Sequence, residues 1–177
     1  MKKFKLLVLF VTIATLLNAT EWVVINSNNP APTKITLLNS DITSSLIQVN
    51  LDGYYATDVK IKNELAKIVS MTNGTPILKM GAPDVQKITT SLIIPDNGKM
   101  SVNIISSKFK EYKNIDILPS KGNLYRDIVP SDIAYEYGEE YVTDSYYPGD
   151  IAELRDPYIV RDFRGQTVVI YPFQYNP

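Results

Sequence analysis

The chain has 177 residues, of which 45% are hydrophobic and 21% are charged, and its formal net charge is −1. These values are typical of one globular domain rather than of a disordered chain. The sequence contains no cysteine and no histidine, which excludes disulfides, zinc sites built on thiolates or imidazoles, and catalysis by Ser-His-Asp or Cys-His groups. Carboxylates, lysine, tyrosine, hydroxyl groups and oxygen-bound metals remain available for chemistry, and no motif predicts a cofactor.

The first nineteen residues have the pattern of a secretory signal peptide. Three lysines precede an uncharged apolar run, Leu6–Leu17, and Ala19 offers a small residue for cleavage. The run is shorter than the roughly 20 residues that a membrane span needs, and the alternatives are an uncleaved anchor or a buried N-terminal strand. We therefore predict a signal peptide over residues 1–19 and a secreted, extracytoplasmic domain over residues 20–177, with no membrane span once the signal is removed.

Removal of the signal peptide would leave an acidic domain. Residues 20–177 contain 15 basic and 19 acidic residues, a net charge of −4. Such a domain lacks the positive surface that attracts nucleic acid, so no nucleic-acid partner is expected. Its length is sufficient for stabilisation by a hydrophobic core alone.

Several short runs alternate apolar and polar side chains and are rich in β-branched residues, which predicts strands. Pro95–Gly98 is typical of a turn, so the runs on either side of it are expected to form a hairpin. Val59–Ser70 also has apolar residues at helical spacing, but the lysines that alternate with Val59 and Ile61 favour a strand. In chain order the predicted strands are Glu21–Ile25, Leu46–Leu51, Val59–Ile61, Ser91–Ile94, Met100–Ile105, Asn114–Leu118, Tyr158–Val160 and Thr167–Tyr171.

Eleven prolines and eight glycines punctuate the chain. Short strands with turn residues between them predict one all-β domain, an antiparallel β-sandwich or jelly roll. The segment Pro119–Pro157 breaks this rhythm, since it shows little alternation and holds six of the twelve tyrosines. Long irregular segments are usually functional or mobile, and these tyrosines would either pin the segment to the sandwich or bind a ligand.

The segment Ile105–Pro177 contains a series of short words: Ser106-Ser107-Lys108-Phe109, Pro119-Ser120-Lys121-Gly122, Pro148-Gly149, Asp156-Pro157, Arg161-Asp162, Arg164-Gly165-Gln166 and Gln174-Tyr175-Asn176-Pro177. In this order and at this spacing, they resemble the N-terminal propeptide of gingipain-type bacterial cysteine peptidases. Two upstream words match more loosely, Gly81-Ala82-Pro83 and Leu92-Ile93-Ile94-Pro95-Asp96, and residues 20–75 carry no comparable match. The resemblance implies an inhibitory and folding-assisting propeptide of a secreted cysteine endopeptidase, with the cognate catalytic domain as its partner.

The catalytic domain of that family uses a cysteine nucleophile and a histidine, and both residue types are absent here. The chain is therefore expected to be non-enzymatic. In the family, the propeptide continues beyond the position of Pro177 into a cleavage junction and the catalytic domain. We accordingly expect an isolated or C-terminally truncated propeptide region.

The resemblance also implies where an inhibitory loop lies. Propeptides of the family carry a basic residue into the primary specificity pocket of the peptidase, and Arg126 is at the matching position. Leu124, Tyr125 and Asp127 flank it, and Lys121 is a nearby basic residue that could take the same role. A planar guanidinium suits a pocket carboxylate, whereas from the residues alone a solvated surface arginine is the common case. Cleavage near Arg126 would then weaken the complex.

Two other clusters of charge have both functional and structural interpretations. The first cluster comprises Arg155, Asp156, Arg161, Asp162 and Arg164. It would form either a face that docks on the catalytic domain or weak cross-strand ion pairs, and we slightly favour the ion pairs. Here Arg164-Gly165 is expected in a turn, and alternation would place Arg161 and Phe163 on one strand face. The second cluster comprises Glu136, Glu139, Glu140, Asp144 and Asp150. Its carboxylates are the oxygen ligands that calcium requires, but their spacing fits no EF-hand loop, so no metal site is predicted. The spacing also selects no pair of carboxylates for a glycosidase.

A carbohydrate-binding or adhesive β-sandwich is the alternative from another functional class. Tyrosine-rich loops suit stacking on sugar rings, and the propeptides of the family are similar in fold to carbohydrate-binding modules. Fold alone does not separate these two functions.

Overall fold

The computed structural model describes residues 20–61 and 64–177, and the predicted signal peptide lies outside the described residues. Within these residues, no helix is long and apolar enough to cross a membrane. The described part of the chain forms ten strands and two single-turn 3-10 helices: β1 (Thr20–Val24), β2 (Lys34–Ser40), β3 (Ser45–Asn50), β4 (Gly53–Ile61), β5 (Glu64–Ser70), β6 (Thr75–Pro76), β7 (Gln86–Ile93), η1 (Pro130–Asp132), η2 (Glu139–Tyr141), β8 (Ala152–Leu154), β9 (Tyr158–Val160) and β10 (Phe163–Ile170).

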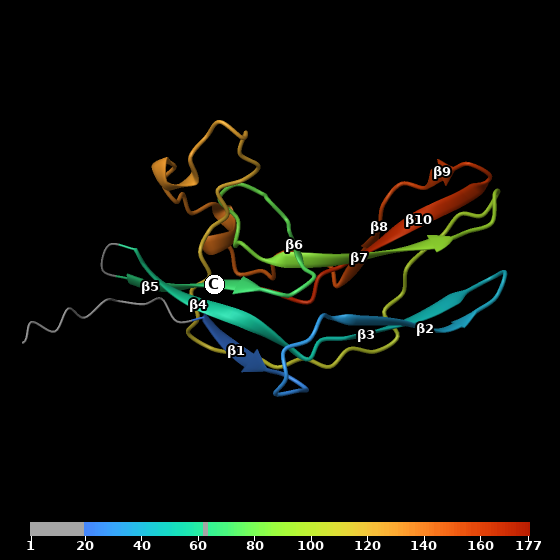
Figure 1. The fold of residues 1–177 in the computed structure, drawn as a ribbon, viewed down its shortest axis with the longest axis horizontal. Helices are drawn as coiled ribbons and strands as arrows, with labels where there is room; N and C mark the ends of the chain where they lie inside the picture. The colour runs from blue at the N-terminus through green and yellow to red at the C-terminus, as the bar shows by residue number, and fades with distance from the viewer. Residues whose placement is uncertain (1–19, 62–63) are drawn as a thin grey trace, which may run out of the picture.

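The strands form sheets that lie in two layers (Figure 1). One layer has the strand order β6-β7-β10-β8, and β9 also pairs with β10. The other layer contains the sheet β1-β4-β5 and the two-stranded sheet β2-β3. Every strand ladder among the described residues is antiparallel. The predicted all-β antiparallel sandwich is therefore confirmed.

The hydrophobic core lies between the two layers, because alternate side chains of each strand point inward. Tyr54 on β4 and Val69 on β5 belong to it, and they meet Ile88 on β7 and Val168 and Ile170 on β10. All five side chains are more than nine-tenths buried. Burial of a large apolar side chain contributes about 1.5–3 kcal/mol relative to exposure, so packing between the layers strongly stabilises the fold.

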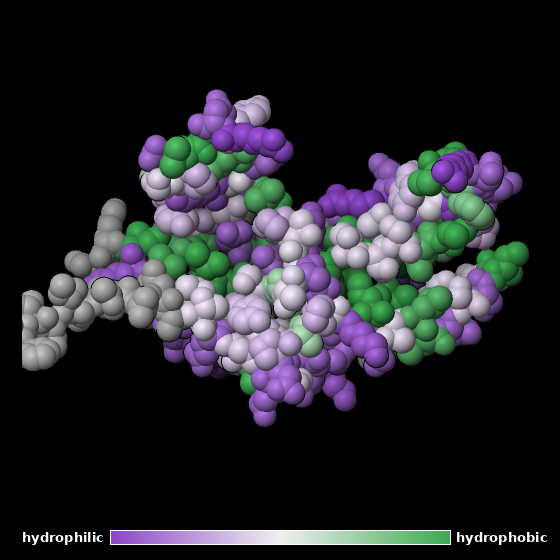
Figure 2. Space-filling model, viewed as in Figure 1, coloured by the Kyte–Doolittle hydropathy of each residue, from purple (hydrophilic) through white to green (hydrophobic). Residues whose placement is uncertain are grey.

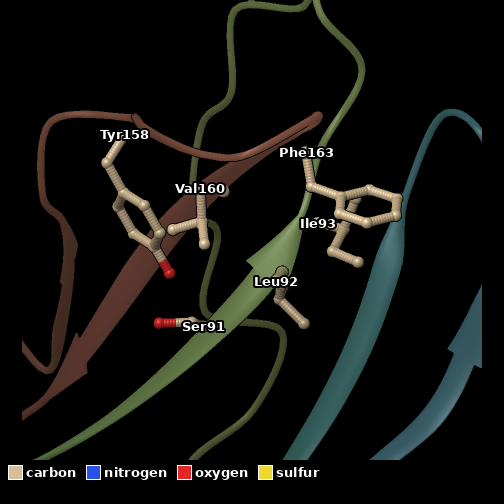
Figure 3. Close-up of a pocket in the computed structure, with 7 residues that line it drawn as sticks. Ser91, Leu92, Ile93, Tyr158, Val160 and Phe163 are labelled. Carbon is tan, nitrogen blue, oxygen red and sulfur yellow. The ribbon is translucent and has the colours of Figure 1, made fainter.

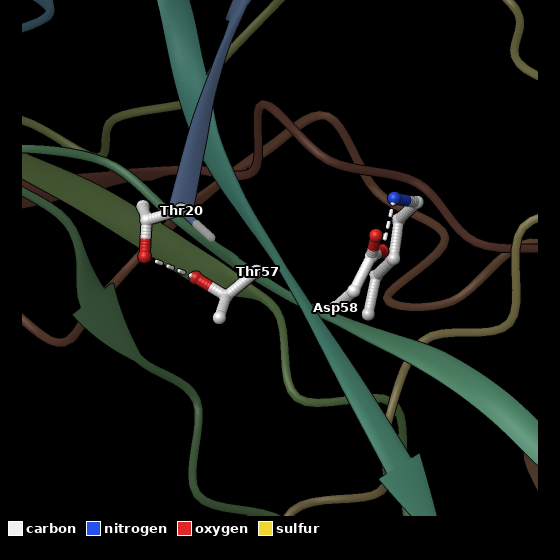
Figure 4. Close-up of polar contacts among 4 residues, drawn as sticks. Thr20, Thr57 and Asp58 are labelled. Carbon is white, nitrogen blue, oxygen red and sulfur yellow. Dashed lines mark hydrogen bonds and ion pairs between the residues drawn. The ribbon is translucent and has the colours of Figure 1, made fainter. Parts of the chain in front are cut away.

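In the sheet β1-β4-β5, side chains interact across neighbouring strands (Figure 4). The hydroxyl oxygens of Thr20 and Thr57 are 2.9 Å apart, and Asp58 on β4 forms an ion pair with Lys67 on β5. β4 and β5 themselves pair as antiparallel strands. The described residues of Val59–Ser70 are therefore strand rather than helix, as the alternating lysines predict.

Gly53 allows Trp22 to close over the start of β4. The Trp22 ring meets the edge of Tyr55 with 5.0 Å between centroids, and its indole N–H donates to the Ser27 carbonyl at 3.1 Å. A Cβ atom on Gly53 would lie 2.5 Å from the Trp22 ring, which is closer than carbon atoms pack. Any larger residue at this position would displace the tryptophan.

The predicted hairpin between Ser91–Ile94 and Met100–Ile105 is wrong. β7 pairs with β10 over six residue pairs, and Met100–Ile105 forms no strand. After β7 the chain crosses to the other layer and runs along it (Figure 1), where the Lys110 ammonium donates to the Ile25 carbonyl at 2.9 Å. β10 is the better partner because its residues 168–170 are all buried and apolar, whereas most of the 100–105 side chains remain exposed.

One further strand prediction and one turn prediction also need correction. Asn114–Leu118 forms no strand and contributes only an isolated bridge, from Ile117 to β5. Arg164-Gly165 is not a turn, since it lies within β10. The turn between β9 and β10 is at Arg161-Asp162, and Arg161 has a φ of 54°. Arg161 therefore does not share a strand face with Phe163.

The segment Pro119–Pro157 is mostly irregular, as predicted, and two of its tyrosines attach it to the sandwich. The Tyr141 hydroxyl donates to the Ile117 carbonyl at 2.7 Å, and its ring lies 5.5 Å from that of Tyr175. Tyr147 and Tyr175 exchange two backbone hydrogen bonds of 2.7 and 2.8 Å. Burial raises the pKa of Tyr147 to about 12. These tyrosines pin the segment, which is one of the two roles that the sequence suggests for them.

An ion pair provides a further attachment of the same segment. Lys79, which follows β6, pairs with Glu140 in η2, and the Glu140 side chain is only 10% exposed. Burial acts to raise the pKa of Glu140, but the hydrogen bond and the charge of Lys79 outweigh it and leave the pKa below its usual value. Glu140 is therefore charged at neutral pH, and the attachment depends on that charge.

Leu118→Ala should strongly destabilise the protein, because Leu118 is 1% exposed and its truncation leaves a cavity. We expect a loss of about 2–5 kcal/mol in the free energy of unfolding, measured by urea denaturation. Leu65→Ala is the matched control, since Leu65 is 61% exposed and its truncation should change stability by about 0.5 kcal/mol or less. Equal losses for the two variants would contradict the packing described here.

Glu140→Gln should lower the melting temperature at neutral pH and have little effect in acid. A carboxylate whose folded pKa is lowered stabilises the fold above its unfolded pKa, and this stabilisation is lost as the pH falls through the folded pKa. The difference between the parent and variant melting temperatures should therefore close well below the usual glutamate pKa of 4.5. Glu136→Gln, at an exposed position, should show no such closing difference in the same thermal scans.

Candidate functional site

The sequence predicts a site at residues 121–127, and the chain enters this region from a rigid base. The Ser120 N–H donates to the Ala82 carbonyl at 2.7 Å, and the Ser120 carbonyl accepts from the Gly81 N–H at 2.9 Å. These two backbone bonds join Ser120 to the segment between β6 and β7. The start of the site is therefore fixed to the sandwich.

Gly122 turns the chain away from this base. Its φ is 77°, in the left-handed region that glycine adopts without strain, and a Cβ atom there would lie 3.0 Å from Cβ of Met80. The Gly122 N–H also donates to Ser120 Oγ at 3.2 Å. We call the residues that follow this turn, 122–130, the Arg126 loop.

A hydrogen-bonded turn forms the tip of the Arg126 loop. The Ile128 N–H donates to the Tyr125 carbonyl at 3.1 Å, which places Arg126 and Asp127 at the two central positions of a β-turn. Both are exposed, Tyr125 is 79% exposed, and Leu124 is half-buried. Within the described part of the chain, Arg126 forms no ion pair. Its guanidinium is therefore available to a binding partner.

Lys121 lies at the base of the Arg126 loop and not at its tip. Its ammonium donates to the Pro130 carbonyl at 2.7 Å and is 4.0 Å from the centre of the Tyr135 ring. Pro130 is the first residue of η1. Sequence reasoning identified neither Tyr135 as part of the site nor the contacts of Lys121 with Pro130 and Tyr135. No spacing rule predicts these contacts, because they form only when the loop folds back.

Two of the acidic residues that suggested calcium form other contacts. Glu140 pairs with Lys79, and a carboxylate oxygen of Asp144 accepts from the Asn176 side chain at 2.9 Å. Among residues 20–61 and 64–177, no group of three or more histidine, cysteine or acidic side chains could hold a metal ion.

Two of the charged residues around β9 and β10, Arg155 and Arg164, form contacts within the domain. Arg155 pairs with Glu153 at 3.1 Å. Nη1 of Arg164 donates to the carbonyls of Pro95 and Gly98 at 2.9 and 2.7 Å, so Arg164 holds the turn that follows β7. These contacts lie within the domain, but they are not the cross-strand ion pairs that the sequence suggested, since Glu153 lies two residues before Arg155 and Arg164 bonds to backbone carbonyls.

An apolar pocket of about 230 Å³ lies between β7, β9 and β10. Figure 3 shows the Tyr158 hydroxyl directed toward Ser91, with Phe163 and Ile93 at the far side. Ile93 is 73% and Phe163 is 59% exposed, and Figure 2 shows apolar side chains gathered at this end of the molecule. Ser91 and Tyr158 supply the only side-chain hydroxyl groups of the lining, so the pocket offers few hydrogen bonds to a sugar.

Comparison with known proteins gives a consistent family. A family model described as Propeptide_C25 matches residues 26–177. Gingipain R2 of Porphyromonas gingivalis is 39% identical over 144 residues, which cover 81% of this chain and 20% of the relative. Gingipain R1 of the same organism is 40% identical over 131 residues, which cover 74% of this chain and 13% of the relative. The chain thus spans only a minor part of the length of these relatives.

Two solved structures are similar to the fold described above. The complex of Porphyromonas gingivalis RgpB pro- and mature domains matches with a TM-score of 0.77 and 38% identity, over 81% of this chain and 75% of that chain. A structure concerning the zymogenic latency of gingipain K from the same organism matches with a TM-score of 0.71 and 16% identity, over 89% of this chain and 88% of that chain. At that identity, the second match shows a shared fold.

The family match begins well before the short words of residues 105–177, and it includes β2, β3, β4 and β5, which belong to the layer built from the N-terminal part of the chain. It therefore confirms the resemblance and extends it to a region where the sequence words alone show none. The chain belongs to the Propeptide_C25 family, the propeptides of gingipain-type cysteine peptidases, and it is not a catalytic domain.

Proposed function

We propose that the chain is the inhibitory and folding-assisting propeptide of a secreted gingipain-type cysteine endopeptidase, and that its partner is the catalytic domain of that enzyme. Family membership supports this proposal, as does the similarity to a structure in which RgpB pro- and mature domains form a complex. Inhibition would act by occupancy: the Arg126 loop fills the primary specificity pocket while the sandwich docks beside it.

The position of Arg126 is the observation that carries the proposal. Arg126 stands at the centre of a closed β-turn, is exposed, and has no ion-pair partner among the described residues. A guanidinium forms two parallel hydrogen bonds with a carboxylate, so it suits an acidic pocket better than a point charge does. Leu124 and Tyr125 precede it and Asp127 follows it, and these residues would contact the rim of the pocket.

Assistance with folding would follow from the same docking. A partner that binds the folded form of the peptidase and not its unfolded chain stabilises the folded form by mass action. The propeptide is suited to this role because the residues of its two-layer core all come from its own chain.

Cleavage near Arg126 would weaken inhibition without unfolding the propeptide. β7 precedes Arg126 and β10 follows it, and these strands pair over six residue pairs. A cut at the loop tip would therefore remove the continuous loop from the pocket but leave both halves of the chain in one sheet. Maturation would need a further step that separates the nicked propeptide from the enzyme.

The carbohydrate-binding alternative has weaker support. Tyr158 and Phe163 are exposed at the pocket beside β9, but the lining there is mainly apolar. Tyr137 is 51% exposed and lines a second pocket, of about 430 Å³, together with Tyr135 and Lys121. Tyr141 and Tyr147 of the segment Pro119–Pro157 attach that segment to the sandwich. We therefore retain the propeptide role, which the exposed position of Arg126 supports.

Arg126→Ala should weaken inhibition of an Arg-specific gingipain-type peptidase by residues 20–177. Truncation of a buried arginine–carboxylate pair costs about 2–5 kcal/mol, since the carboxylate is left unpaired, and this corresponds to roughly thirty-fold or more in the inhibition constant. Arg126→Lys should weaken inhibition less, or redirect it toward a Lys-specific peptidase. The melting temperature should hold, because an exposed loop side chain contributes about 0.5 kcal/mol or less to folding.

Lys108→Ala is the matched control for Arg126→Ala, because Lys108 is an exposed basic residue outside the Arg126 loop. It should leave the inhibition constant unchanged. If Arg126→Ala inhibits as well as the parent domain, the loop assignment is wrong. If the parent domain never binds the peptidase, the inhibitory role itself fails, and binding to immobilised polysaccharides becomes the next measurement.

The exported protein should begin near Thr20, because basic residues and a short apolar run precede Ala19. Mass spectrometry of the secreted protein would identify this N-terminus. Val11→Arg interrupts the apolar run and should block export, whereas Thr20→Ser should leave it intact. Recovery of a secreted chain with an intact Met1–Leu17 segment would contradict the prediction.

A further inference from the structure

We propose that Lys121 is a positioning residue that clasps the base of the Arg126 loop and holds the loop in its binding conformation before the peptidase arrives. This inference rests on the proposed inhibitory function. The sequence allows either Lys121 or Arg126 to enter the specificity pocket of the peptidase. The inference assigns Lys121 a different role.

The contacts of Lys121 join the two ends of the loop. Lys121 stands at the start of the loop, and its ammonium donates to the carbonyl of Pro130, nine positions later, at 2.7 Å. The same ammonium lies 4.0 Å from the centroid of the Tyr135 ring, within the distance at which a cation is attracted to an aromatic face. Residues 122–129 therefore form a ring that is closed by one side chain.

The chemistry of lysine suits this clasp. An ammonium has three N–H donors and carries its charge in a compact group, so it can donate to a carbonyl and face an aromatic ring at once. The Lys121 side chain is half-buried, and both of its partners lie within the propeptide. The ammonium is therefore directed into the base of the loop, and only Arg126 remains at the tip as a basic group.

Closure at the base would act on binding through conformational entropy. A loop that is already ordered loses less freedom when it enters a pocket, and its affinity is higher for that reason. Two other hydrogen bonds have the same effect: the Gly122 N–H donates to Ser120 Oγ at 3.2 Å, and the Ile128 N–H donates to the Tyr125 carbonyl at 3.1 Å. The clasp is the contact that links the two ends.

The clasp also spans the bond after Arg126. Hydrolysis of the Arg126–Asp127 peptide bond adds water across it, which leaves a carboxylate on Arg126 and an amine on Asp127. Lys121 lies before that bond, and Pro130 and Tyr135 lie after it, so the clasp holds the two new ends near one another. An intact clasp should therefore slow the release of the cut loop and make the propeptide a poor substrate.

The test compares Lys121→Met, which keeps the stem but removes the ammonium, with Lys121→Arg, which can still donate to Pro130 and stack on Tyr135. We expect Lys121→Met to raise the inhibition constant roughly ten-fold, to be cut faster after Arg126, and to exchange the Ile128 N–H faster in the free domain. Lys121→Arg should retain all three parent properties. Tyr135→Ala should resemble Lys121→Met, and Tyr135→Phe should resemble the parent.

Unchanged melting temperatures would show that these effects are local to the loop. In the Arg126→Ala background, Lys121→Met should cause no further loss of inhibition, because the clasp acts through Arg126. An additional loss there, with unchanged Ile128 exchange, would mean that Lys121 contacts the peptidase directly and would overturn the clasp. If Lys121→Met inhibits like the parent while Arg126→Ala does not, the clasp is wrong and the proposed function stands. If neither change matters, the proposed function fails.

Discussion

The pairing of β7 with β10 is the contact on which the rest of the structure depends. It joins Gln86–Ile93 to Phe163–Ile170 over six residue pairs, although all of residues 94–162 lie between them in the sequence. Both ends of that long segment are therefore fixed in one sheet, and the Arg126 loop is part of a closed excursion from it. The entropy of closing such an excursion grows only with the logarithm of its length, so burial of β10 in the core can offset it.

The excursion is held to the sandwich at several points, and these points determine how the loop is presented. Its first part lies along the opposite layer, where Tyr112 meets the edge of the Tyr54 ring at 6.1 Å. Its second part is attached through Ser120 and through Tyr141. The Arg126 loop thus projects from a rigid base, which is the arrangement that a binding loop needs, since its affinity suffers if the supporting residues move.

Local patterns account for the elements that the sequence predicts and for those that it misses. β3 is predicted because its alternation is uninterrupted, and β9 is predicted because three β-formers stand between turn residues. β2 is missed because its ladder with β3 has an irregularity between Leu37 and Asn39, which shifts the period. β6 and β8 have two and three residues, too few for alternation to show. They are strands only because β7 and β10 offer them an edge.

By itself, the sequence determined the all-β class, the family resemblance and the irregular segment that contains the candidate loop, because each of these is written in neighbouring residues or in short words. Only the tertiary structure decided that Ser91–Ile94 pairs with β10 and not with Met100–Ile105. It also decided that Lys121 lies at the base of the loop while Arg126 lies at the tip. Both outcomes depend on contacts between residues far apart in the chain, and such contacts produce no periodic pattern in the local sequence.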